Sequence, residues 1–147
     1  MSQPHIVSVL LVDDNPGDRT LTRLALERNR LAYEAMFFEA TGGRDCLDFL
    51  YRRGRHAAAT RPDLILLDLN MPDMNGEEVL HAIKSDDNLK SIPVVILTSS
   101  DRDQDVDRSY ALQASCYIRK PVDMTSIHTV ISKLSEFWFA IVRFPPT

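Results

Sequence analysis

The chain has 147 residues, of which 44% are hydrophobic and 26% are charged, a composition typical of one globular domain. Its formal net charge of −4 argues against a nucleic-acid-binding surface, because such surfaces are normally basic. No apolar run approaches the length of a membrane span and residues 1–8 carry no secretory signal pattern, so we expect a cytoplasmic protein that binds neither membranes nor nucleic acids.

In chain order, strand patterns alternate with helix patterns. Residues 7–12 form a short apolar run rich in valine, which ends at a turn over residues 13–17. Residues 18–29 place apolar side chains at helical spacing. Residues 33–39 predict a second strand, and a glycine pair separates it from a second helix whose apolar face lies within residues 46–50.

The second half of the chain continues this alternation. Residues 63–67 are nearly all apolar and end on Asp68, and residues 93–97 repeat the pattern. A strand that is apolar at consecutive positions is buried on both faces, which is typical of the centre of a parallel sheet. The remaining patterns are a basic, alanine-rich loop over residues 52–62, helices around residues 79–83, 106–112 and 123–138, and a strand over residues 115–119.

Five strands alternating with five helices predict an α/β fold, in which a doubly wound parallel sheet carries helices on both faces. No linker or internal repeat divides the sequence, so we expect a single domain over residues 1–147. Its core spans about residues 7–135, and residues 136–147 form an apolar C-terminal tail.

Polar side chains follow the predicted strands at the points where the strands end. Asp13 and Asp14 follow the first strand, Asp68 the third, Thr98 the fourth and Lys120 the fifth. The carboxyl ends of parallel strands meet at one edge of the sheet, where open α/β folds bind their ligands. Three clustered carboxylates repel one another, so positive charge must share the site. Lys120 supplies one charge, and a hard divalent cation such as Mg²⁺ is the natural second source.

These residue types favour phosphoryl transfer. Asp68 is the candidate nucleophile, because a carboxylate can attack phosphorus and form an acyl phosphate. The metal and the Lys120 ammonium stabilise the charge on the transferring group, and the Thr98 hydroxyl donates a hydrogen bond to it.

The chain carries a set of motifs in fixed order: Asp13-Asp14, the segment LDLNMPDMNG over residues 67–76, Thr98, and Lys120-Pro121. The order of these motifs resembles that of response-regulator receiver domains, and the resemblance covers about residues 7–135. The resemblance implies the flavodoxin-like strand order 2-1-3-4-5. It also implies a phospho-acceptor signalling protein, not an enzyme acting on other substrates, with Asp68 phosphorylated by a histidine kinase.

The resemblance further implies roles for individual residues. Asp14, Asp68 and the backbone carbonyl of Asn70 would bind Mg²⁺, with Asp13 in the outer acidic shell. Thr98 and Tyr117 would form the switch pair, whose hydroxyl and aromatic ring move once phosphate arrives.

A narrower resemblance comes from residues 53–60, the Cys116-Tyr117 pair and the tail from Phe137 to Pro146. These features are similar to the small stand-alone regulators that are paired with bacterial phytochrome kinases. The resemblance implies a phytochrome-type histidine kinase as partner, and output through protein contacts. We also expect a homodimer, formed by the C-terminal segment or by the face of the fourth helix, fifth strand and fifth helix. The consecutive rings of residues 137–139 span too wide an arc for one helix to bury against its own core.

Several alternatives use the same residues. A phosphatase of the haloacid-dehalogenase type also combines a strand-end aspartate with a hydroxyl and a lysine, but it carries a second aspartate where this chain has Asn70. A receiver-like scaffold that acts without phosphorylation is the other functional alternative. Locally, Asp13-Asp14 are also candidate turn residues, Thr98 is a candidate helix N-cap, and the tail is a candidate to fold back over its own domain.

Overall fold

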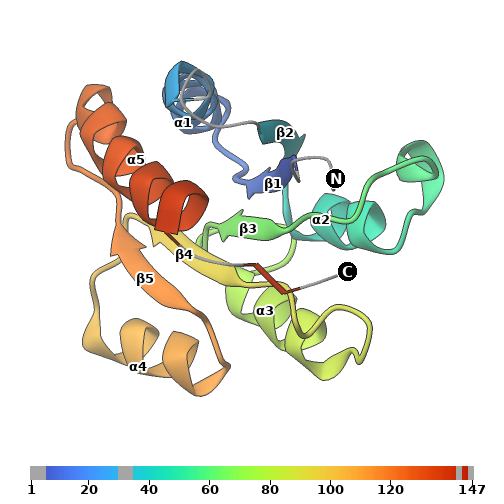
Figure 1. Ribbon diagram of the computed structural model, residues 1–147. Helices are drawn as coiled ribbons and strands as arrows, with labels where there is room; N and C mark the ends of the chain where they lie inside the picture. Colours follow the sequence, from blue (N-terminus) through green and yellow to red (C-terminus); the bar gives the residue numbers. More distant parts are fainter. Residues whose placement is uncertain (1–5, 30–34, 142–143, 146–147) are drawn as a thin grey trace.

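The computed structural model describes residues 6–29, 35–141 and 144–145. One sheet of five parallel strands has the order β2-β1-β3-β4-β5, which confirms the expected topology (Figure 1). The strands are β1 (Val7–Val12), β2 (Ala35–Ala40), β3 (Leu64–Leu67), β4 (Val94–Thr98) and β5 (Cys116–Arg119). The second strand was predicted to begin at residue 33, which lies outside the described residues, and it continues to Ala40, one residue beyond the prediction.

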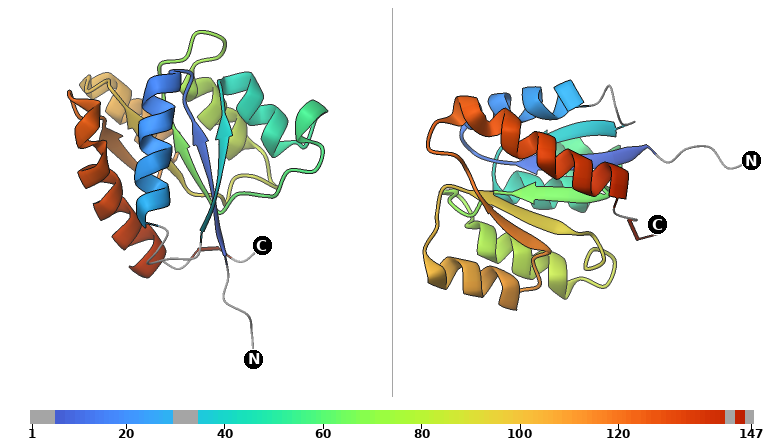
Figure 2. Two further views of the ribbon diagram at one scale, coloured as in Figure 1. Left: turned by 90° about the horizontal axis from the view of Figure 1, so that it is seen from above. Right: turned by 60° about the vertical axis from the view of Figure 1, so that its left-hand side comes forward.

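Helices cover both faces of the sheet. They are α1 (Pro16–Asn29), α2 (Gly43–Leu50), α3 (Gly76–Ser85), α4 (Asp103–Ala111) and α5 (Ile127–Ser135). Helices α1 and α5 lie side by side on one face, and α2, α3 and α4 lie on the other (Figures 1 and 2). No helix within the described residues is long and apolar enough to cross a membrane.

The sheet divides the core into two apolar clusters. Successive side chains of a strand point to opposite faces. Leu10 and Val12 of β1 therefore pack with α2 and α3, while Val9 and Leu11 pack with α1 and α5. All four side chains of β3 are buried in the same alternating way, which explains why an unbroken apolar run marks a central strand of this sheet.

Helix α1 begins two residues earlier than the apolar spacing predicts. The Asn15 side chain accepts a hydrogen bond of 3.0 Å from the Asp18 N–H, so Asn15 caps the helix. Pro16 suits the first helical position, because its fixed φ is helical and that position needs no N–H donor. The turn after β1 is therefore already the start of α1, and this brings Asp18 to the end of the strand.

The β3–α3 loop packs directly against the end of β3. The Gly76 N–H donates to the Leu69 carbonyl oxygen at 2.9 Å, and a Cβ atom at position 76 would lie 2.3 Å from the carbonyl oxygen of Asp68. Only glycine, which has no Cβ atom, allows the backbone at residue 76 to lie this close to the backbone of Asp68. The Asn75 side chain then caps α3 by accepting from the Glu77 N–H at 2.7 Å.

The C-terminal segment differs in part from the prediction of one helix to residue 138. Helix α5 ends at Ser135 and a short π-helical segment follows over Glu136–Ile141. Trp138 is buried in the core beneath α1 and α5 and stacks on Phe144, whereas Phe137 remains 52% exposed. The tail thus folds back over its own domain at Trp138, whereas the Phe137 ring remains available to contact another molecule. The side chain of Phe139 lies outside the described residues.

Candidate functional site

The predicted polar side chains meet at the carboxyl edge of the sheet around the Lys120 ammonium. Its Nζ atom lies 2.7 Å from Asp13 Oδ2 and 3.2 Å from Asp68 Oδ2. All three residues are buried, with 5%, 2% and 6% of their surface exposed for Lys120, Asp13 and Asp68. Parallel pairing causes this meeting, because β1, β3 and β5 end at the same edge.

Thr98 lies on the other side of the Asp68 carboxylate. Its hydroxyl donates to Asp68 Oδ1 at 2.7 Å, and the Asn70 N–H donates to the same oxygen at 3.2 Å. The Asn70 amide Nδ2 lies 3.4 Å from the Thr98 hydroxyl. Both oxygens of Asp68 are therefore engaged, Oδ1 by a hydroxyl and a backbone N–H, and Oδ2 by an ammonium. Thr98 is not the N-cap of α4, since Arg102 occupies that position.

The acidic residues fit a divalent metal. Asp13, Asp14 and Asp68 each offer a carboxylate oxygen, and these oxygens lie within 4.8 Å of one another. Carboxylate oxygens are preferred ligands of hard divalent cations such as Mg²⁺. The set is sparse for a complete coordination shell, which leaves room for water and phosphoryl oxygens.

Lys120 is held in its charged form. Burial by itself would lower the pKa of this ammonium, but the hydrogen bond with Asp13 and the negative charges of Asp68 and Asp13 outweigh it and raise the pKa above the ordinary value. A buried ammonium between carboxylates supplies permanent positive charge next to Asp68.

Asp18 also contacts the Lys120 ammonium, and the sequence reading did not identify it. Its Oδ2 atom lies 3.0 Å from Lys120 Nζ. The sequence marks residue 18 only as the predicted start of a helix. One sequence signal could have identified Asp18: it lies in the first turn of a helix that directly follows Asp13-Asp14. Side chains in a helix tilt toward its N-terminus, so the Asp18 side chain points back toward the end of the strand.

Tyr117 lies apart from this carboxylate cluster. Its hydroxyl donates to the backbone oxygen of Ser100 at 2.7 Å, and its ring packs against the core on the α2–α3 face. Burial raises the pKa of Tyr117, so the hydroxyl remains a donor. Ser100 is two residues beyond Thr98, so the Tyr117 side chain is tied to the loop that follows β4.

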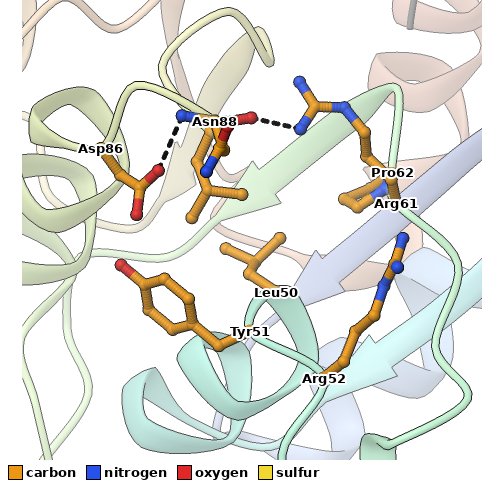
Figure 3. A pocket seen from close by; sticks show the side chains of 8 residues that line it. Leu50, Tyr51, Arg52, Arg61, Pro62, Asp86 and Asn88 are labelled. Atoms are coloured by element: carbon orange, nitrogen blue, oxygen red, sulfur yellow. Dashed lines mark hydrogen bonds between the residues drawn. The ribbon is translucent and has the colours of Figure 1, made fainter.

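A cavity lies at the amino-terminal edge of the sheet, opposite the carboxylate cluster. This cavity of about 300 Å³ is lined by Leu50, Tyr51, Arg52, Arg61, Pro62, Asp86, Asn88 and Leu89 (Figure 3). Arg61 donates to the backbone oxygen of Asn88 across one side of it. The cavity adjoins the amino ends of β3 and β4, and none of the predicted site residues lines it.

Comparison with known proteins agrees with this geometry. Residues 9–132 match the family described as response regulator receiver domain. The response regulator Rcp1 of Synechocystis sp. is 36% identical over 137 residues, which cover 93% of this chain and 92% of that protein.

Two solved structures are similar over nearly the whole chain. The Mn²⁺-bound form of Rcp1 has a TM-score of 0.89 at 34% identity and covers 95% of this chain and 99% of that one. The phosphorylated cyanobacterial phytochrome response regulator RcpA has a TM-score of 0.86 at 37% identity and covers 97% of this chain and 100% of that one.

Proposed function

We propose that this chain, which belongs to the response regulator receiver domain family, accepts a phosphoryl group from a histidine kinase on the side chain of Asp68. The observation that carries the proposal is the pair of donors on this carboxylate. Thr98 contacts one oxygen of Asp68 at 2.7 Å and Lys120 contacts the other at 3.2 Å. A phosphoryl group attached there would find a hydroxyl and an ammonium within reach of its oxygens.

The proposed chemistry uses the chain's own residues in distinct roles. A carboxylate oxygen of Asp68 attacks the phosphorus of a phosphohistidine, a P–O bond forms, and the P–N bond to the imidazole breaks. Lys120 and Thr98 stabilise the negative charge on the transferring oxygens. Receiver domains are signalling proteins, and the product here is the phosphorylated chain itself.

Mg²⁺ is the proposed cofactor. Asp14, Asp68 and the backbone carbonyl of Asn70 would hold it, with Asp13 in the outer shell, and the bound ion would supply positive charge to the phosphoryl oxygens. The cluster of three carboxylate oxygens supports this assignment, as does the similarity to Rcp1, for which a Mn²⁺-bound structure is known.

The proposed partner is a phytochrome-type histidine kinase, and the signal would pass on through protein contacts. Support comes from the similarity to RcpA, a phytochrome response regulator. We also propose a homodimer that uses the C-terminal segment, alone or together with the surface of α4, β5 and α5. An apolar groove on that surface includes Ile118 of β5 and Val130 of α5 and ends at the exposed Phe137 ring.

Incubation with phosphoramidate and Mg²⁺, followed by intact-mass measurement, tests the proposed function. We expect one added phosphate in the wild type and none in Asp68→Asn. Asn70→Asp is the matched test for hydrolase chemistry, because it introduces the carboxylate that haloacid-dehalogenase enzymes carry at this position. Equal labelling of Asp68→Asn would refute the assignment, and turnover of a simple phosphate ester by the wild type would favour the hydrolase alternative.

A further inference from the structure

All three N–H bonds of the Lys120 ammonium have carboxylate acceptors within the described part of the chain. Asp13, Asp18 and Asp68 lie 2.7, 3.0 and 3.2 Å from Nζ. An ammonium has three donors, so this set uses its full capacity. Phosphorylation turns the Asp68 carboxylate into an acyl phosphate, so phosphoryl oxygens would first take over the Asp68 contact at 3.2 Å, and a second phosphoryl oxygen could bind Lys120 only if it released Asp13 or Asp18.

The two contacts that phosphorylation of Asp68 leaves chemically unchanged, to Asp13 and to Asp18, differ in how readily Lys120 can release them. Asp13 makes the shortest contact and its side chain is 2% exposed, so losing Lys120 would leave a buried carboxylate without its cation. The Asp18 side chain is 25% exposed, and water can replace Lys120 as its partner. Of these two contacts, the one to Asp18 is therefore released at the smaller cost.

The position of Asp18 is built into the fold. Its N–H is bound by the Asn15 cap at 3.0 Å, within the first turn of α1. The next residue, Arg19, donates to the backbone oxygen of Asp13 at 2.9 Å and fastens that turn to the end of β1. A packed helix start thus presents the Asp18 carboxylate to Lys120.

We propose that Asp18 is a positioning residue that holds the Lys120 ammonium in the unphosphorylated protein and competes with the phosphoryl group for it. This inference rests on the proposed phosphorylation of Asp68. Asp18 opposes the binding of phosphoryl oxygens in two ways. Its carboxylate occupies an N–H donor that phosphoryl oxygens need, and its negative charge repels those oxygens from a short distance.

In contrast, Asp18 should favour the binding of a metal ion. A fourth carboxylate near the cluster of Asp13, Asp14 and Asp68 attracts a divalent cation. Neutralising Asp18 should therefore strengthen the binding of a phosphoryl-like anion and weaken the binding of Mg²⁺. A purely structural role would instead weaken both, because a displaced helix start would disturb the whole site.

The test measures both affinities by calorimetry in the full chain. Beryllium fluoride serves as the phosphoryl mimic at saturating Mg²⁺, and Mg²⁺ alone is titrated separately. Asp18→Asn keeps the size of the side chain, and Asp18→Ala removes the contact. Asp107→Asn is the control, because it removes the same charge from an exposed position on α4. We expect beryllium fluoride to bind both Asp18 variants roughly three- to tenfold more tightly, and Mg²⁺ to bind roughly two- to fivefold more weakly, the range for one partly exposed charge.

The outcomes separate this inference from the proposed function. Unchanged or weaker binding of beryllium fluoride by both Asp18 variants would overturn the role of Asp18 alone. If the wild type binds no beryllium fluoride in Mg²⁺, the proposed function fails and the inference fails with it. NMR of the ¹⁵N-labelled Lys120 ammonium, assigned through Lys120→Arg, reports independently on the contact between Asp18 and Lys120 in the unphosphorylated protein. The ammonium protons should exchange faster with water in Asp18→Ala. Unchanged exchange would contradict the contact.

Discussion

The Thr98 hydroxyl donates a hydrogen bond of 2.7 Å to Asp68 Oδ1, and both residues are buried. Thr98 ends β4, and the same strand leads into the loop whose Ser100 carbonyl accepts from Tyr117. A new phosphoryl oxygen on Asp68 would compete for the Thr98 hydroxyl. A shift of Thr98 would move the loop and alter the contact of Tyr117 on the α4–β5–α5 surface.

Thr98→Ala should leave Asp68 able to accept phosphate but uncouple the response of Tyr117. The substitution removes the hydroxyl, while Lys120 and the acidic cluster remain. NMR spectra with and without beryllium fluoride should show shifts at Tyr117 in the wild type and in the control Thr98→Ser, and much smaller shifts in Thr98→Ala. If Tyr117 responds fully in Thr98→Ala, the coupling follows another route.

Asp14→Ala should abolish labelling by phosphoramidate even though Asp68 remains. The protein offers few metal ligands here, and losing one should weaken Mg²⁺ binding by about tenfold or more. Chelation of the metal should have the same effect on the wild type, and Asp103→Ala, an exposed change on α4, should label normally. Normal labelling in the presence of chelator would contradict a metal requirement.

Gly76→Ala should destabilise the protein strongly. The added Cβ would lie 2.3 Å from the Asp68 carbonyl oxygen and 2.6 Å from Leu69 Cα, both of them backbone atoms that cannot turn aside. We expect a loss of about 2 kcal/mol or more in the free energy of unfolding, measured with urea. Gly17→Ala is the control, since its Cβ would meet only the side-chain oxygen of Asn15, at 3.3 Å, and its stability should change little.

Asp45 should make stability depend on acid pH. Partial burial works against ionisation of this carboxyl, but hydrogen bonds from the Thr41 N–H, His56 and Arg55 hold its pKa at about 2, below the ordinary 3.8. A depressed folded-state pKa stabilises the fold above about pH 4 and loses this contribution as pH falls toward 2.

Asp45→Asn should therefore be less stable than the wild type at pH 7, by on the order of 1–2 kcal/mol after allowance for solvent screening. The difference between the two proteins should shrink as pH falls from 4 to 2. Urea unfolding of both proteins across this range measures it. A difference that stays constant down to pH 2 would mean that the charge of Asp45 is not the source.

Phe137 and Trp138 should have separate effects on assembly and on stability. Phe137 is 52% exposed and Trp138 is 9% exposed. Phe137→Ser should dissociate the proposed dimer in sedimentation with little change in thermal stability. Trp138→Ala should instead destabilise the domain by about 3–5 kcal/mol, because it leaves a cavity in the core. A wild-type monomer at micromolar concentration would rule out the dimer.

The sequence by itself was sufficient to predict the sheet and most of the site. Consecutive apolar runs such as residues 64–67 can only be buried on both faces, and their alternation with helices leaves a parallel sheet as the arrangement. Parallel strands end at one edge, so Asp13, Asp68 and Lys120 had to converge once their strands were recognised. The strand order and the individual roles came from the resemblance of the motifs to a known family.

Only the tertiary structure decided which side chains touch. The contact between Asp18 and Lys120 joins residues 102 positions apart. The place of Asp18 in the first turn after β1 turns its side chain toward the strand end, but whether it reaches Lys120 depends on the angle at which α1 leaves β1. The burial of Trp138 beside an exposed Phe137 likewise depends on how the segment after α5 packs against the core. Periodicity determines which residues share a face of one element, whereas contacts between elements depend on how the helices pack on the sheet.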